Sequence, residues 1–162
     1  MASLWRRGLC HGKRLGAVTL CAGLLSMSVS AQSEGGLYIA GDGFSFEQAA
    51  NRGLSQNPKG RRFFVLSLPP GSDALMKSAP GAVVALRDRV RASNGVLLVC
   101  QRDIDSGAID ASTLVAGVVA VRGFPPPGSK AIAPGERYFP GEDRSSLPQS
   151  NEALRRLRST CS

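Results

Sequence analysis

The chain has 162 residues, of which 43% are hydrophobic and 20% are charged, and its basic residues outnumber its acidic residues by eight. Its length suits a single domain with a modest core, and it contains no internal repeat or coiled-coil heptad. The basic residues are interspersed with acids, as in Arg87-Asp88-Arg89, and no aromatic residues accompany them, so the charge does not predict nucleic-acid binding.

Residues 1–31 have the pattern of a secretory signal peptide. Four basic residues and no acidic ones precede an apolar run from Leu15 to Val29, and Val29-Ser30-Ala31 offers a cleavage site before Gln32. The run is shorter than the roughly 20 residues that a membrane helix needs, so we expect removal and no stable membrane insertion. General secretion to the periplasm is favoured over the twin-arginine route that Arg6-Arg7 suggests.

Cleavage would change the chemistry that is available to the chain. The discarded segment contains the residues Trp5, Cys10, His11 and Cys21. The remaining 131 residues have no histidine and only two cysteines, Cys100 and Cys161, which excludes a Ser-His-Asp triad, a Cys-His pair and an imidazole metal site. We therefore expect no metal and no cofactor, while the oxidising periplasm permits a disulfide.

Hydrophobic patterning in residues 37–68 predicts a strand, a helix and a second strand. Leu37 to Ala40 is a short apolar stretch that ends at a Gly41-Asp42-Gly43 turn. A capping box that begins at Ser45 starts a helix, and Asn57-Pro58-Lys59-Gly60 ends it. Phe63 to Leu68 is almost continuously apolar, as in a strand that is buried on both faces.

The next fifty residues continue the alternation. Residues 82–92 predict a helix with one apolar face, which Asn94-Gly95 ends, and Gly95 to Cys100 is a second continuous apolar strand. A short helix over Ala111 to Val115 and a strand over Gly117 to Val121 follow. The pattern predicts a three-layer α/β domain over residues 32–123, with a mostly parallel sheet of four or five strands.

Residues 124–162 differ from the rest of the chain. The stretch from Phe124 to Leu147 contains five prolines and predicts an extended arm that lies over the domain. A final helix, capped by Ser150 or Asn151, should run to about Thr160, with its arginines near the negative end of the helix dipole.

Cys100 is the residue most suited to chemistry. Parallel strands end at one edge of the sheet, where ligands bind in such folds, and Cys100 lies at that edge before a helical turn. Unpaired backbone N–H groups and Arg102 would stabilise its thiolate, whereas Asp103 and Asp105 would raise its pKa. The alternative is a buried, inert cysteine or half of a disulfide.

Cys161 is the natural partner of Cys100. Leu154, Leu157 and Cys161 follow helical spacing, so the sulfur lies on the apolar face of the last helix. A bond between the two cysteines would close a long loop and pin the proline-rich arm to the sheet.

Three weaker motifs have ordinary structural interpretations. Gly41-Asp42-Gly43 lacks the third glycine of a dinucleotide-binding loop and predicts a turn. Ser72-Asp73 predicts the cap of a short helix that extends through Met76. Asp103 and Asp105 lack further ligands and predict a solvated pair rather than a metal site.

The segment from Gly95 to Gly123, GVLLVCQRDIDSGAIDASTLVAGVVAVRG, resembles the second half of DsrE/DsrF-like domains. In that family a Gly-Val strand ends in a cysteine, and a short helix, a glycine and an I-D-x-x-x-L-x-x-G-V passage follow. The matching positions are Gly95, Val96, Cys100, Gly107, Ile109, Asp110, Leu114, Gly117 and Val118. The resemblance implies a flavodoxin-like fold, assembly into trimers or hexamers, and a sulfur-carrying role for Cys100.

Two hypotheses for function follow. In the first, the protein is a periplasmic thiol or sulfur carrier in which Cys100 holds the sulfur and Cys161 resolves it. In the second, it is a non-catalytic envelope protein or an accessory subunit of a secretion or conjugation apparatus, and a Cys100–Cys161 disulfide is structural. Both predict a protein partner or a homo-oligomer.

Overall fold

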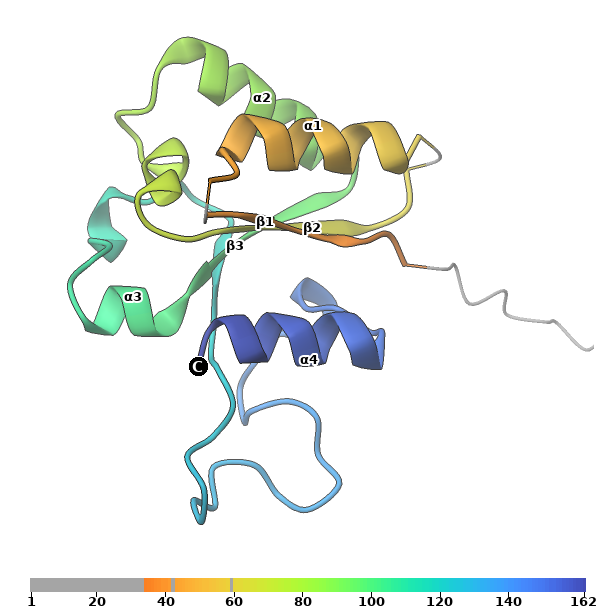
Figure 1. The fold of residues 1–162 in the computed structure, drawn as a ribbon, viewed down its shortest axis with the longest axis vertical. Helices are drawn as coiled ribbons and strands as arrows, with labels where there is room; N and C mark the ends of the chain where they lie inside the picture. Colours follow the sequence, from red (N-terminus) through yellow and green to blue (C-terminus); the bar gives the residue numbers. More distant parts are fainter. Residues whose placement is uncertain (1–33, 42, 59) are drawn as a thin grey trace, which may run out of the picture. The chain divides into compact units, whose positions relative to one another are not determined.

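A four-stranded parallel sheet is the centre of the computed structural model, which describes residues 34–41, 43–58 and 60–162 (Figure 1). Its strands are β1 (Leu37–Ala40), β2 (Phe63–Ser67), β3 (Gly95–Cys100) and β4 (Val118–Val121). They are hydrogen-bonded in the order β1-β2-β3-β4, and every neighbouring pair is parallel. The predicted α/β class is therefore confirmed. The predicted signal peptide, residues 1–31, lies outside the described residues.

Helices cover both faces of the sheet. Helices α1 (Phe46–Gln56) and α2 (Gly81–Ala92) lie on one face, and α4 (Asn151–Thr160) lies on the other (Figure 1). The short helix α3 (Gln101–Asp105) follows β3 directly. The connections also contain three 3₁₀ turns, η1 (Gly71–Leu75), η2 (Ala111–Thr113) and η3 (Arg144–Ser146).

Local signals in the sequence explain where most elements begin and end. The predicted capping box is present, because Ser45 Oγ accepts from the Gln48 N–H at 3.2 Å and Gln48 Oε1 accepts from the Ser45 N–H at 2.8 Å. Strand β3 has the predicted bounds. Asn94, rather than the glycine after it, adopts the left-handed conformation that ends α2, with a φ of 63°.

Two short elements differ from their predictions. The helix expected over residues 111–115 is the three-residue turn η2, which Asp110 caps by accepting from the Ser112 N–H at 2.8 Å. The turn η1 begins at Gly71 after Pro70, with no side-chain cap, so the prediction that Ser72-Asp73 caps it is wrong. Proline at the start of the turn already supplies a suitable φ.

The sheet separates two apolar clusters. Phe46, Phe63, Val65 and Val99 belong to the cluster beneath α1 and α2. The cluster on the opposite face combines strand residues, Cys100 and residues from the C-terminal segment. β2 is buried along its whole length, as the continuous apolar pattern predicts.

The C-terminal segment supplies the second outer layer. Because crossovers between parallel strands are right-handed, a sequential strand order places the connecting helices on one face of the sheet. The other face is covered by Tyr138 and Leu147 from the proline-rich arm and by Leu154 and Leu157 from α4, all of them buried. The arm therefore packs over the domain, as predicted.

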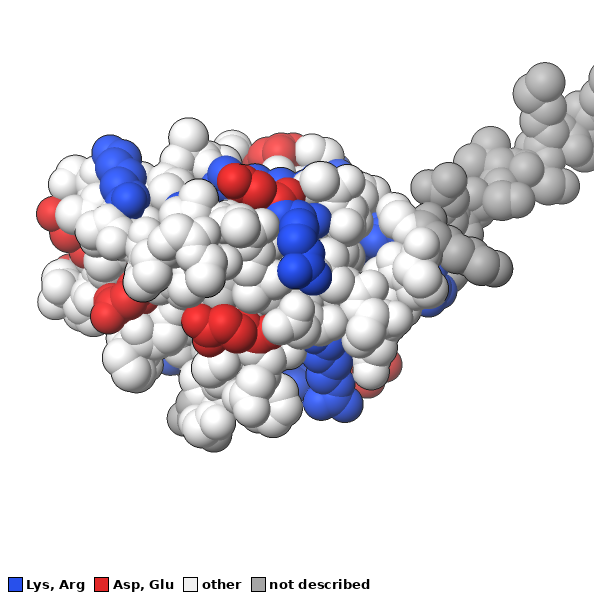
Figure 2. Space-filling model, turned by 90° about the horizontal axis from the view of Figure 1, so that it is seen from above, with Lys and Arg blue, Asp and Glu red and all other residues white. Residues whose placement is uncertain are grey.

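Figure 2, which looks onto α1 and α2, shows a mostly uncharged face with a few separate acidic and basic groups. No large continuous area of one sign is present on this face. Among the described residues, no helix has the length and apolarity required to cross a bilayer.

Gly123 allows the end of α4 to pack closely against the chain that leaves β4. A Cβ at this position would lie 2.6 Å from the carbonyl carbon of Cys161 and 2.6 Å from the Cα of Ser162. Both obstacles are backbone, so they cannot move as a flexible side chain would. We predict that Gly123→Ala lowers the free energy of unfolding by about 1–3 kcal/mol in urea denaturation. Gly81→Ala, where a Cβ meets nothing within 4 Å, is the matched control and should leave stability equal or slightly higher.

Candidate functional site

The two predicted site residues are joined in the structure. Cys100, the last residue of β3, forms a disulfide with Cys161, which follows α4, and their Cα atoms are 5.1 Å apart. Cys100 is 0% exposed and Cys161 is 2% exposed. The bond joins the C-terminal end of the sheet to its second outer layer, and solvent has almost no access to either residue.

The local features that were expected to activate a thiolate at Cys100 are a short helix and an arginine that is engaged elsewhere. Cys100 occupies the N-cap position of α3, but this helix has only five residues. The Arg102 guanidinium donates through Nη1 to the backbone carbonyl of Ser162, and its Nε lies 3.4 Å from Asp103 Oδ1. Arg102 therefore helps to hold the C-terminus beside the disulfide.

A buried ion pair fixes α4 against the arm. Arg158 donates to both carboxylate oxygens of Glu142, through Nη1 at 3.2 Å and Nη2 at 2.7 Å. It also donates to the backbone carbonyls of Arg122 and Arg137, each at 3.0 Å, and its guanidinium lies 4.9 Å from the centre of the Phe139 ring. One side chain thus joins the exit of β4, the arm and the last helix.

Removing the partner of this buried guanidinium should be costly. The Arg158 side chain is only 3% exposed, so Glu142→Gln leaves its charge without a compensating carboxylate. We expect a loss of about 3 kcal/mol in the free energy of unfolding, measured by urea denaturation. The control is Glu136→Gln, which removes the partner of Arg144 in an exposed ion pair of 3.2 Å and should cost less than about 1 kcal/mol. Equal losses would mean that the buried pair has no special role.

Asp143 stabilises the turn η3 in the arm. Its carboxylate accepts from the Ser146 hydroxyl at 2.5 Å, from the Ser145 hydroxyl at 2.7 Å and from the Ser145 N–H at 2.9 Å. The hydrogen bonds from Ser146 and then Ser145 lower the pKa of Asp143. The turn directly precedes the buried Leu147, which anchors the arm in the core.

The direction of this pKa shift determines its effect on stability. The pKa of Asp143 in the folded protein lies below that of a free aspartate. The ionised Asp143 carboxylate therefore stabilises the fold at pH values above the ordinary aspartate pKa, and this stabilisation is lost as the pH falls through the folded-state pKa. We predict that Ser145→Ala combined with Ser146→Ala raises the pKa of Asp143 in a carboxyl-carbon NMR titration. The pKa of Asp110, which the hydrogen bonds of Ser112 lower, is the internal control and should not change.

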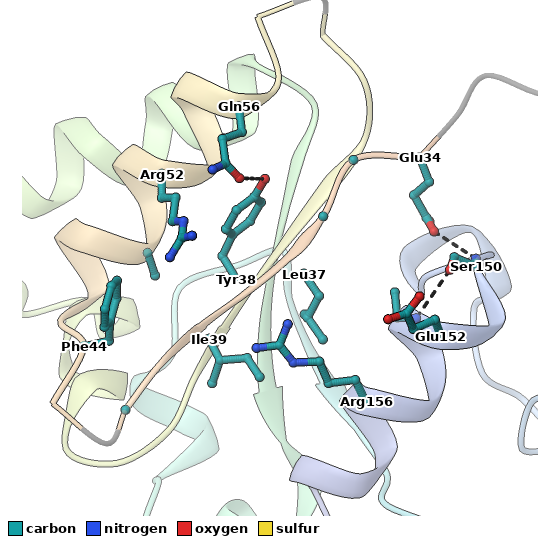
Figure 3. Close-up of a pocket in the computed structure, with 15 residues that line it drawn as sticks. Glu34, Leu37, Tyr38, Ile39, Phe44, Arg52, Gln56, Ser150, Glu152 and Arg156 are labelled. Carbon is teal, nitrogen blue, oxygen red and sulfur yellow. Dashed lines mark hydrogen bonds between the residues drawn. The ribbon is translucent and has the colours of Figure 1, made fainter.

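A groove of about 640 Å³ lies along the free edge of β1 (Figure 3). Leu37 and Ile39 contribute to its floor, with Tyr38 on the side of α1. Helix α1 forms one wall through Arg52 and Gln56, and the start of α4 forms the other. The full lining is Glu34, Gly35, Gly36, Leu37, Tyr38, Ile39, Gly41, Phe44, Ala49, Arg52, Gln56, Ser150, Glu152, Ala153 and Arg156.

Hydrogen bonds hold both walls of the groove in place. The hydroxyl of Tyr38 donates to Gln56 Oε1 at 2.9 Å, which joins β1 to α1. The Glu34 carboxylate accepts from the Gln149 N–H at 2.8 Å and from the Ser150 N–H at 2.9 Å, which joins the segment before β1 to the start of α4. The groove is therefore formed by secured elements of the fold.

Sequence reasoning found the disulfide partners and missed the groove and the buried ion pair. The groove combines residues more than 100 positions apart, and no local pattern brings α4 beside β1. The one available signal was helical spacing, because Glu152 and Arg156 are four residues apart and thus share a face of α4. Among the described residues, no three side chains of His, Cys, Asp or Glu are grouped so that they could hold a metal.

Comparisons with known proteins do not assign the chain to a family. Neither a scan against protein-family models nor a search of curated proteins gives a match. The resemblance to DsrE/DsrF-like domains stays a prediction from the sequence, and the function has to be argued from the geometry.

Proposed function

We propose that this protein is exported, loses residues 1–31 and acts in the cell envelope as a non-catalytic accessory subunit, for example of a secretion or conjugation apparatus. In this proposal the Cys100–Cys161 disulfide is a permanent structural crosslink. The protein would then work by binding other proteins.

The burial of both sulfur-bearing residues is the observation that supports a structural disulfide. A thiol that attacks a substrate or carries sulfur must be ionised and accessible. Here the bond lies in the apolar cluster with Leu98, Val121 and Leu157, and a separation of 61 residues makes its loop long. In the chain-entropy description, closing such a loop stabilises the fold by about 4 kcal/mol. This value is large beside the net stability of a small domain.

Export is supported by two independent features. Stable disulfides are characteristic of oxidising compartments and are rare in the cytosol. The leader pattern of residues 1–31 predicts transfer into such a compartment, and both bonded cysteines lie beyond the expected cleavage site.

The sulfur-carrier hypothesis requires a free and accessible Cys100 instead of a permanent disulfide. It rests on the resemblance of residues 95–123 to DsrE/DsrF-like domains, in which the matching cysteine is the sulfur-accepting residue. For this protein it requires Cys100 to be released from Cys161 and exposed. We favour the structural proposal because the fold encloses the bond.

One measurement tests the location and the role of the disulfide together. The protein is isolated from the periplasmic fraction, treated with iodoacetamide with and without mild reductant, and its intact mass is determined. We expect a chain that begins at Gln32, is lighter by two hydrogen atoms than the dithiol and gains no alkyl group. An intact Met1 on cytosolic material, or rapid alkylation of Cys100 near neutral pH, would reject the proposal.

Stability measurements complete the test. We expect Cys161→Ser and the double variant Cys100→Ala with Cys161→Ala to lose comparable stability, about 4 kcal/mol, because each removes the same crosslink. A double variant as stable as the native protein would show that the bond is not structural and would favour the redox alternative.

A further inference from the structure

The free edge of β1 presents unpaired backbone groups to the groove. The carbonyl of Gly36 accepts from Phe64 and that of Ala40 accepts from Leu68, so these residues direct their polar groups toward β2. Alternation along the strand turns the N–H and C=O groups of Leu37 and Ile39 in the opposite direction, into the groove. No described strand lies on that side, because β1 is the edge of the sheet. Such an edge is a template for a further strand.

Two arginines without partners line this edge from opposite walls. Arg52 extends from α1 and Arg156 from α4, and both side chains reach toward β1 (Figure 3). Both residues are exposed, and neither guanidinium forms a hydrogen bond or an ion pair with a described residue. By contrast, Arg87, Arg91 and Arg158 all donate to carbonyls elsewhere in the fold. The groove therefore combines free backbone groups with two available positive charges.

We propose that this groove binds an extended acidic segment of a partner protein, which adds to the sheet beside β1 as a fifth strand. The inference rests on the proposed non-catalytic, protein-binding role and specifies the chemistry of the partner. Backbone hydrogen bonds to Leu37 and Ile39 would provide the affinity common to any such strand, and side chains on the two walls would provide selectivity.

The alternation of a strand indicates which residues the segment should carry. Successive side chains of the added strand would face α1 and α4 in turn. Two adjacent acidic residues would therefore place one carboxylate near Arg52 and the next near Arg156, which are suited to bidentate pairing. Where the peptide passes Glu34 and Glu152, a neutral or basic residue is favoured, because these two carboxylates would repel an acidic side chain of the peptide. Four strand residues span about 13 Å, which suits an occupant of about four to six residues.

A second copy of this chain fits the groove less well than a single strand does. Each copy carries its own α1 and α4 beside β1, so two copies that pair through this edge bring four helical walls together. An antiparallel pairing centred on Tyr38 would also place the two copies of Arg52 near each other on one face and the two copies of Arg156 on the other. The groove thus favours a peptide without flanking helices, whose carboxylates can lie near Arg52 and Arg156.

Selection from a random nonapeptide library displayed on phage, with the purified protein immobilised, tests the proposal. We expect enriched peptides to contain adjacent Asp or Glu residues among β-forming residues and to lack proline. The strongest binder, synthesised with a fluorescent label, is then titrated, and ¹⁵N NMR should show its largest amide shifts at Leu37 and Ile39. Absence of enrichment, enrichment of basic peptides, or shifts away from β1 would each overturn the proposal.

Matched variants separate the groove from general charge effects. Arg52→Glu with Arg156→Glu should weaken binding at least tenfold at low salt. Arg89→Glu with Arg155→Glu makes the same change in net charge on α2 and α4 outside the groove lining, and should change binding less than twofold. Equal weakening by the two pairs would overturn the proposed site.

A third substitution tests the backbone contact. Ile39→Pro removes an N–H that points away from β2, so the sheet is retained while the edge loses a donor. It should weaken binding at least tenfold, whereas Ile39→Val should have little effect, and thermal unfolding verifies that both variants fold. If Ile39→Pro fails to fold, the same donor is probed in the native protein by protection of the Ile39 amide from hydrogen exchange. Unchanged exchange at saturating peptide would overturn the strand addition.

Sedimentation velocity of the native protein and of Ile39→Val tests the competing occupant. The protein could form a dimer that acidic peptide does not dissociate and whose interface NMR locates at β1. This result would mean that a second copy fills the groove, and it would overturn the peptide assignment. The intact-mass measurement on the same preparation separates this failure from failure of the proposed function. If the disulfide resists alkylation and no peptide binds, only the groove proposal is rejected. If Cys100 is alkylated rapidly, the structural role of the bond is rejected.

Discussion

The sequential order of the strands is the constraint on which the rest of the structure depends. Right-handed crossovers place α1 and α2 on the same face, so the sheet has an apolar second face that no crossover helix covers. Residues 124–162 cover it, although a proline-rich segment cannot form a regular layer. The disulfide at one end of α4 and the buried Arg158–Glu142 pair compensate for this irregularity by fixing the segment at specific points.

Much of the fold could be predicted because its signals are local. Continuous apolar runs identify buried parallel strands, and the capping box at Ser45 identifies the start of a helix within one residue. The position of Cys100 at the C-terminal edge of the sheet follows from the strand pattern and from the parallel order. Even the pairing with Cys161 could be anticipated, since a processed chain would contain no other cysteine.

The rest of the site could not be predicted because it depends on which face of a helix meets which partner. Arg155, Arg156 and Arg158 have the same chemistry, and only Arg158 lies in the last turn of α4. Tertiary packing gives them different roles: Arg158 is buried against Glu142, Arg156 reaches the groove, and Arg155 lies outside the groove lining. Helical spacing shows that the three side chains point in different directions from α4, but it does not show which part of the fold each side chain contacts.

The disulfide and the groove are linked through α4. Without a fixed α4, only one wall would flank the unpaired backbone groups at the edge of β1, and an uncovered strand edge is an aggregation hazard. The crosslink at Cys161 holds one end of α4, and the hydrogen bonds from the Gln149 and Ser150 N–H groups to Glu34 hold the residues just before its other end, so the second wall stays in place. A redox-active pair would have to release one of these ends in every cycle and would loosen the wall. A permanent bond is therefore the arrangement most compatible with binding along β1.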